Sequence, residues 1–239
     1  MNDTLKRIRE SERQSHTEIY SNEKLYDSDS WLKKPINSVL ELLPMFADYN
    51  RINILDLGCG VGRNCLPFAI KYKSKCDIVC VDILDIAINK LNENAISFSV
   101  DSAIKGYVSA IEDFIIDHNK YDLIMAISAL EHIDSKESFI KKLYEIKSGL
   151  RKNGIVLLVV NSEIQEFDKS NGIPFTPQFE VNLTTDELQN IFNNVFAEWS
   201  ILKNSVSFQE YDIPRNQISS HLQTNVITYI AKNTNRKEQ

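Results

Sequence analysis

Three glycines and two acids stand where the sequence would otherwise be a buried strand followed by a helix. The stretch ILDLGCGVGRN places Gly58, Gly60 and Gly62 at alternate positions, just after an apolar run that contains Asp56. Glycine loses the most conformational entropy on folding, so three in one turn indicate backbone that approaches another group closely. Such a turn between a strand and a helix predicts an anion or nucleotide site. Asp82 stands at the end of the next predicted strand, 20 residues after Gly62.

Strand-like and helix-like segments alternate along the chain and would position these residues. Strands are expected at residues 52–57, 77–82, 106–110, 121–128, 154–161, 196–205 and 225–233, and helices at 63–72, 84–95, 136–150 and 184–192. Strands that are apolar throughout and alternate with helices are typical of a parallel sheet covered on both faces. We therefore predict a seven-stranded, mostly parallel, doubly wound α/β sheet.

The ends of the chain suggest a cap and two insertions around this sheet. Residues 1–48 are expected to form an N-terminal helical cap, and residues 49–235 the main domain. Within the main domain, residues 161–183 and 204–223 read as loop insertions. Loops of about twenty residues are long for a compact domain and indicate a functional role.

These motifs, in this order, resemble those of the class I S-adenosylmethionine (SAM) dependent methyltransferases. ILDLGCGVGRN is similar to the first motif of that family, and YVSAIEDF, YDLIMAISALEHI and LRKNGIVLLVV resemble the segments that follow it. The resemblance covers roughly residues 50–232. It implies a Rossmann-like methyltransferase fold in which the last strand, around residues 224–232, runs antiparallel next to strand six. GRN, a loop with paired prolines and phenylalanines, and ITYIAKN resemble the tellurite-resistance methyltransferases, which act on small acceptors.

The resemblance implies SAM as cofactor and S-adenosylhomocysteine as product. Asp56 would help to hold the methionine amino group, and Asp82 would bind both ribose hydroxyls. The adenine amino group has three alternatives, Glu112, Asp113 or backbone, because Ala110 or Ile111 stands where many members have an acid. The candidate cofactor-binding residues are Asp56, Gly58, Cys59, Gly60, Gly62, Arg63, Asn64, Asp82, Ile83, Ile111, Glu112, Asp113, Ile127 and Ser128.

Asn64 has a structural alternative, and the catalytic residue is left open. Asn64 is expected either to cap the following helix or to lie beside the cofactor. The backbone N–H of Cys59 is expected to face the ligand. An anionic acceptor needs no general base, whereas a hydroxyl or amine acceptor needs one. The candidates for that base are His132, Glu131 and His221, and His132 has the alternative role of fixing its loop.

Position alone suggests which residues contact the acceptor. Segments that could cover the carboxyl edge of the sheet, where ligands of such sheets bind, hold Tyr20, Tyr26, Trp31, Phe175, Tyr211 and Arg215.

Composition narrows the class of partner. The formal charge of −6 argues against nucleic acid as a ligand, because basic residues are needed to bind phosphates. No apolar run approaches the roughly 20 residues of a membrane helix, and the charged N-terminus does not resemble a secretory signal. Four cysteines without a CxxC pair, and no clustered ligand spacing, indicate reduced thiols and no metal. A cytoplasmic monomer or homodimer is expected.

These observations give one main hypothesis and several alternatives. The main hypothesis is methyl transfer from SAM to a small molecule by in-line displacement. The alternatives are a protein or RNA methyltransferase and a non-catalytic SAM-binding protein. An NAD-linked oxidoreductase is a more distant alternative, because its glycine spacing is usually G-x-G-x-x-G.

Overall fold

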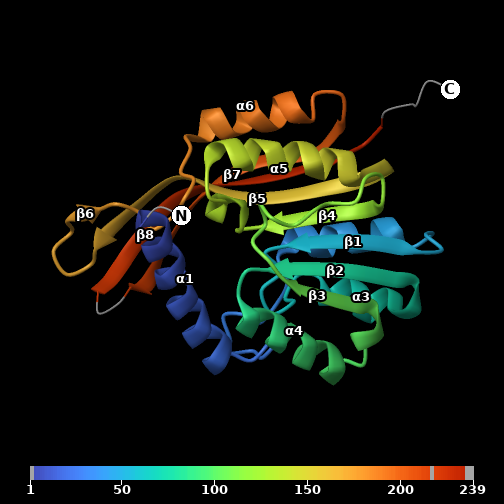
Figure 1. Cartoon of the computed structure of the whole chain (residues 1–239), viewed down its shortest axis with the longest axis horizontal. Coiled ribbons are helices and arrows are strands. Elements are labelled where there is room, and N and C mark those ends of the chain that lie inside the picture. Colours follow the sequence, from blue (N-terminus) through green and yellow to red (C-terminus); the bar gives the residue numbers. More distant parts are fainter. Residues whose placement is uncertain (1–2, 216–217, 235–239) are drawn as a thin grey trace.

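The computed structural model describes residues 3–215 and 218–234, which build one mixed sheet with helices packed against it (Figure 1). The strands are β1 (Ile52–Leu57), β2 (Cys76–Asp82), β3 (Ile104–Val108), β4 (Tyr121–Ile127), β5 (Leu150–Asp168), β6 (Pro174–Phe175), β7 (Ser200–Arg215) and β8 (Ile218–Lys232). The α-helices are α1 (Asp3–Asn22), α2 (Asn37–Leu42), α3 (Leu66–Tyr72), α4 (Asp85–Ser97), α5 (Lys136–Gly149) and α6 (Thr185–Val195). Short 3-10 turns are η1 (Leu43–Phe46), η2 (Lys73–Lys75), η3 (Asp101–Ala103) and η4 (Leu130–His132).

The sheet has the strand order β3-β2-β1-β4-β5-β8-β7, with the two-residue β6 paired to β5. Strands β1 to β5 run parallel, and β8 runs antiparallel between β5 and β7. The predicted α/β fold and the antiparallel last strand are therefore confirmed. The strand order reverses between β1 and β4, and ligands of such sheets bind beyond the carboxyl ends of the strands at this reversal.

Alternate side chains of the central strands bury two separate apolar layers. Ile54 packs into the cluster that includes residues of α2, α3 and α4, whereas Leu55 and Leu57 pack with residues of α5 and α6. All three side chains are fully buried. Strands covered on both faces hold the carboxyl edge rigid, so the turns that follow them are fixed in place.

The predicted loop at residues 204–223 is wrong. The structure has a long hairpin there, in which β7 pairs with β8 from Ser200 to Arg215. Val206 and Phe208 alternate with Ser205, Ser207 and Gln209 as in a strand, but residues 204–210 are exposed, so neither face of this part of β7 packs into the core. Main-chain hydrogen bonds to β8 hold the strand instead. Part of the predicted loop at 161–183 is also strand, because β5 continues to Asp168.

The N-terminal cap is smaller than predicted. Val39, Leu42 and Phe46 are at most 2 % exposed, so α2 and η1 belong to the main core and not to a lid. Only α1 lies across the carboxyl ends of the parallel strands (Figure 1). The predicted start of the sixth strand is also wrong, since residues 196–199 precede β7 and bury Phe196 and Trp199.

Two features of the described residues bear on membrane and metal binding. Within residues 3–215 and 218–234, no helix combines the length and the apolar character needed to cross a bilayer. The same described residues contain no group of three or more His, Cys, Asp or Glu side chains placed to hold a metal ion.

Candidate active site

A cavity of about 440 Å³ lies at the carboxyl edge of the sheet, between α1 and the turns that follow β1, β2 and β4. Its lining comes from six stretches of the chain that are separated in sequence. Residues of α1 are Lys6, Arg9, Glu10, Arg13, His16 and Tyr20; residues of the first turns are Gly58, Asp82, Ile83 and Leu84; the rest are Ala110, Ile111, Glu112, Ser128, Ala129, His132 and Glu180. The volume falls within the range of about 300–1,000 Å³ that is usual for small-molecule sites.

The glycine turn after β1 packs too tightly for side chains. Gly58 has φ +71°, and a Cβ there would lie 2.2 Å from the Cβ of Ala129. Gly60 has φ +53°, and its Cβ would lie 2.9 Å from the hydroxyl oxygen of Tyr20. Glycine is therefore needed at these positions for its left-handed backbone and for close contact with the turn after β4 and with α1.

Asp82 links the glycine turn to the end of β2. One carboxylate oxygen accepts a hydrogen bond from the Gly60 N–H at 2.8 Å, and the other accepts from the Leu84 N–H at 2.9 Å. Burial raises the pKa of Asp82, although these two bonds act in the opposite direction. Each oxygen keeps a second acceptor position. The carboxylate lines the cavity and therefore fits a ribose diol.

Asp56 lies behind the glycine turn, outside the cavity lining, and is 2 % exposed. Its Oδ2 atom has no hydrogen-bond partner among the residues that the structure describes. Burial raises the pKa of Asp56 to about 7. A buried carboxylate with an unsatisfied oxygen fits a ligand ammonium group, which would supply both charge and donors.

One prediction about this turn is wrong, and one of the two alternatives for Asn64 is excluded. The Cys59 N–H donates to the carbonyl oxygen of Val81 at 3.0 Å, so it is not turned toward a ligand. Asn64 does not cap the next helix, because α3 begins at Leu66 with Cys65 as its N-cap residue. Instead, Asn64 Oδ1 accepts a hydrogen bond from the Ile36 N–H at 3.2 Å and anchors the N-terminal segment.

Most of the α1 face that covers the cavity was not predicted from the sequence. Its members, Lys6, Arg9, Arg13, His16 and Tyr20, are spaced 3, 4, 3 and 4 residues apart. That spacing places them on one side of a helix and is the sequence signal that could have found them. Arg9 bridges two acids across the cavity, Glu112 by a hydrogen bond and Glu180 with Nε 3.5 Å from Oε1.

His132 and Glu180 form a hydrogen-bonded pair in the cavity wall. His132 Nδ1 lies 3.1 Å from Glu180 Oε2, and the imidazole stacks on Phe179 with ring centroids 4.9 Å apart. The Glu180 side chain is only 2 % exposed. The Val181 N–H donates to the Glu131 carbonyl at 2.9 Å, which fixes the two segments together. No local pattern predicts Glu180, because its partner is 48 residues away.

Comparison with known proteins identifies the family. Residues 49–229 match the family model described as a methyltransferase domain. The chain belongs to this family of methyltransferases. The ubiquinone biosynthesis O-methyltransferase of Rickettsia canadensis (strain McKiel) is 21 % identical over 202 residues, which cover 79 % of this chain and 80 % of that protein.

Two further similar proteins match over a shorter stretch or at lower identity. The ajmaline N-methyltransferase of Rauvolfia serpentina is 28 % identical over 103 residues, and the match covers 41 % of this chain but only 33 % of that protein. The crystal structure of TehB from Haemophilus influenzae superposes with a TM-score of 0.59 at 19 % identity, covering 82 % of this chain and 62 % of that chain. The expected likeness to class I SAM-dependent methyltransferases, including the TehB type, is confirmed.

In this methyltransferase the cavity lining includes six of the predicted cofactor residues: Gly58, Asp82, Ile83, Ile111, Glu112 and Ser128. The other predicted cofactor residues do not line it: Asp56, Cys59, Gly60, Gly62, Arg63, Asn64, Asp113 and Ile127. Gly60 nevertheless contacts Asp82, and Tyr26 donates its hydroxyl hydrogen bond to the Arg63 carbonyl at 2.8 Å. Gly60 is therefore held by a residue of the lining, and Arg63 by a residue outside it.

Among the predicted catalytic candidates, only His132 lines the cavity. Glu131 is 1 % exposed and accepts from the Asn161 backbone N–H at 3.4 Å, and burial raises its pKa. His221 lies on the β7–β8 hairpin, 3.1 Å from Asp212. Both are held by neighbours outside the cavity.

Among the predicted acceptor contacts, only Tyr20 lines the cavity. Tyr26, Trp31, Phe175 and Tyr211 do not, and Trp31 is 62 % exposed. The side chain of Arg215 lies outside the part of the structure that is described.

Proposed function

We propose that this protein transfers the methyl group of SAM to a small molecule at an oxygen or nitrogen atom that carries a proton. One observation carries the proposal: a single cavity is bounded both by Gly58 and Asp82 of the cofactor turn and by the His132–Glu180 pair. A group that binds a cofactor and a group that can accept a proton thus face the same space.

The residues around the cavity would hold the cofactor in a fixed orientation. Asp82 would accept from the ribose hydroxyls, Asp56 would pair with the ammonium group, and Glu112, which lines the cavity, would contact the adenine amino group. SAM, when bound, supplies a methyl group on a positively charged sulfur. Helix α1 would exclude water from the cavity, and alignment of the reactants alone can supply roughly 7–11 kcal/mol of the barrier.

The partner of His132 defines its role. A hydrogen bond from His132 Nδ1–H to the Glu180 carboxylate would leave the lone pair of the imidazole on Nε2. That nitrogen can take the proton of a hydroxyl or amine acceptor as the new bond to carbon forms and the carbon–sulfur bond of SAM breaks. Stacking on Phe179 and the bond to Glu180 would hold the imidazole in one orientation.

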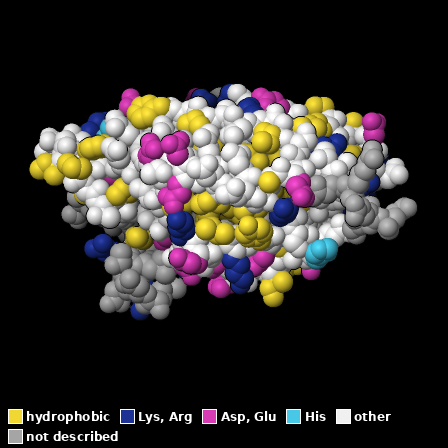
Figure 2. Space-filling model, turned by 90° about the horizontal axis from the view of Figure 1, so that it is seen from above, with side chains coloured by type: hydrophobic (Ala, Val, Ile, Leu, Met, Phe, Trp, Pro, Cys, Tyr) yellow, Lys and Arg dark blue, Asp and Glu magenta, His cyan; other side chains and the backbone are white. Residues whose placement is uncertain are grey.

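Two observations favour a small acceptor. The cavity of about 440 Å³ is covered by α1, which a macromolecular substrate would have to displace. The face that carries α5 and α6, away from the cavity, has acidic and basic side chains interspersed (Figure 2). Two relatives are named as O- and N-methyltransferases. A cytoplasmic location and a monomeric or homodimeric state are part of this proposal.

The test is incubation of the purified protein with methyl-labelled SAM and a cell extract separated into small molecules and macromolecules. Label in the small-molecule fraction is expected. Label on protein or RNA would contradict the small acceptor, and SAM binding with label in neither fraction would favour a non-catalytic SAM-binding protein.

The proton-accepting role is tested on the identified acceptor. His132→Ala should lower kcat by about 100-fold or more and leave the Kd of SAM nearly unchanged. His221→Ala, which changes a histidine outside the cavity, is the matched control. Glu180→Gln should shift the pH profile of kcat. An unchanged kcat in His132→Ala would show that the acceptor is already anionic and needs no base.

A further inference from the structure

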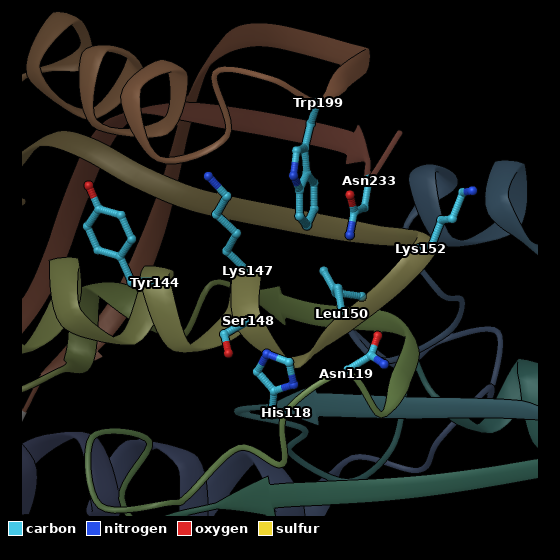
Figure 3. Close-up of a pocket in the computed structure, with 9 residues that line it drawn as sticks. All are labelled: His118, Asn119, Tyr144, Lys147, Ser148, Leu150, Lys152, Trp199 and Asn233. Atoms are coloured by element: carbon cyan, nitrogen blue, oxygen red, sulfur yellow. The ribbon is translucent and has the colours of Figure 1, made fainter. Parts of the chain in front are cut away.

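A second cavity, of about 490 Å³, lies at the opposite edge of the sheet from the proposed active site. It is formed by the loop before β4, the last turns of α5, the start of β5, the segment before β7 and the end of β8 (Figure 3). The seven residues of β4 separate the two cavities by about 20 Å at roughly 3.3 Å per residue. A molecule bound here is therefore not the methyl acceptor.

Backbone hydrogen bonds fix the walls of this cavity. The Asn119 N–H donates to the Ser148 carbonyl at 2.9 Å and ties the loop before β4 to α5. The Asn153 N–H donates to the Asn233 carbonyl at 2.8 Å and ties the start of β5 to the end of β8. The cavity is therefore a preformed feature of the fold.

The charge of this lining is positive, in a chain whose net charge is −6. Lys147, Lys152 and His118 line the cavity, and none of its nine lining residues is an acid. Within the described residues, neither lysine has an ion-pair partner. Two acids of the flanking segments are already paired, Asp117 with Lys120 at 2.6 Å and Glu145 with Lys142.

Leu150 and Trp199 form an apolar part of the lining between the two lysines (Figure 3). Trp199 is 6 % exposed and packs on Phe196 with ring centroids 5.0 Å apart. Its indole N–H is buried and has no hydrogen-bond partner in the described structure, which is costly for a buried donor. In Figure 3 the indole nitrogen lies on the side of the ring that faces Lys147.

We propose that this cavity binds a small ligand with an anionic oxygen group, a phosphate or a carboxylate, attached to an apolar body. The anionic group would lie between the Lys147 ammonium and the Trp199 N–H, and the apolar body would lie against Leu150. An oxyanion there supplies the acceptor that the indole N–H lacks and the negative charge that the two lysines lack.

Fluorescence titration of a Trp31→Phe background tests the proposal, because Trp199 is then the only tryptophan of the chain. The probes are phenyl phosphate, benzoate and inorganic phosphate, added without SAM, so the result is independent of methyl transfer. We expect phenyl phosphate or benzoate to change Trp199 emission saturably. The tighter of the two identifies the anionic group, and inorganic phosphate should bind more weakly because it has no apolar body.

Variants on one helix separate the site from general surface charge. Lys147→Ala should weaken binding about tenfold, since it removes a charged hydrogen bond. Lys141→Ala, on the same helix with a side chain 77 % exposed and paired to Glu145, should leave binding unchanged. No saturable change with either aromatic probe, or equal binding by these two variants, would overturn the proposal. Inorganic phosphate binding as tightly as the aromatic probes would also contradict it.

Discussion

The two cavities lie at opposite edges of one sheet and are built from different kinds of residue. The cavity at the carboxyl edge has a glycine turn, the buried carboxylate of Asp82 and a covering helix, α1. The cavity at the amino edge has two lysines, a buried tryptophan and no acid. Carboxylates that end strands suit a ligand with hydroxyl and ammonium donors, whereas lysines suit an anion. The same sheet can therefore hold two chemically distinct ligands about 20 Å apart.

The largest expected effect comes from filling the glycine turn. Gly58→Ala adds a Cβ 2.2 Å from Ala129 at φ +71°. We expect the free energy of unfolding to fall by about 2–4 kcal/mol, from overpacking and left-handed strain together. Gly172 has the same φ of +71°, and a Cβ there would meet no atom within 4 Å. Gly172→Ala should therefore show the strain alone, about 1–2 kcal/mol.

Urea unfolding of these two variants, together with SAM titration, checks this contrast. Gly58→Ala should also lose SAM binding, whereas Gly172→Ala should keep it. Equal losses of stability in the two variants would show that contact with Ala129 does not constrain the turn.

The next effect is on ribose binding. Asp82→Ala should weaken SAM binding by about 100-fold or more, because two hydrogen bonds to a charged group contribute roughly 1.5–3 kcal/mol each. It also frees the N–H groups of Gly60 and Leu84. Asp82→Asn keeps one acceptor oxygen and should give an intermediate loss. Calorimetric titration measures both, and unchanged affinity would place the ribose elsewhere.

Asp56 should give stability a pH dependence of the opposite sign to that of an ion-paired acid. Burial raises its pKa from 3.8 to about 7 in the folded protein, so between these values the folded state holds a proton that the unfolded state has lost. Its contribution to stability is therefore present at low pH and falls as pH rises toward 7, by about 2 kcal/mol from pH 5 to 6.5.

Unfolding of Asp56→Asn across this pH range is the check. The variant should show a flatter profile than the parent protein, with a smaller slope left from Asp82, whose pKa burial also raises. Asp101→Asn, in the exposed turn η3, is the control and should keep the parent profile. An identical profile in Asp56→Asn would show that this carboxyl is ionised throughout.

The smallest expected effects are on SAM affinity in variants of α1, the helix that covers the cavity. Arg9 is partly buried between Glu112 and Glu180 and forms an ion pair with each. Arg9→Ala should weaken SAM binding roughly fivefold to tenfold, because both carboxylates in the cavity wall then lose their cationic partner. Arg13 lies 3.5 Å from Asp85 on the exposed side, and Arg13→Ala should change affinity less than about threefold. Similar losses in both variants would show that α1 contributes only overall charge.

The carboxyl edge was predictable from the sequence because its signals are local. The glycines of one turn and the acid that ends the next strand occupy short stretches, and apolar strands alternating with helices predict a parallel sheet. Asp82 and Gly58 do line the cavity together. The family resemblance then supplied the antiparallel last strand, which the structure confirms.

The remaining features depend on contacts between distant parts of the chain. Glu180 meets His132 across 48 residues, and Arg9 meets Glu112 across 103 residues, so no local spacing reveals either contact. The hairpin of β7 and β8 depends on main-chain pairing between its two strands, and residues 204–210 of β7 bury neither face. The amino-edge cavity has the same character, because separate segments from His118 to Asn233 contribute its lining.

A crystal structure of the protein with S-adenosylhomocysteine tests the central claim most directly. We expect the ligand in the carboxyl-edge cavity, with its ribose on Asp82, its amino group toward Asp56 and α1 closed over it. Ligand in the amino-edge cavity between Lys147 and Trp199, or ligand at the carboxyl edge without contact to Asp82, would contradict that claim.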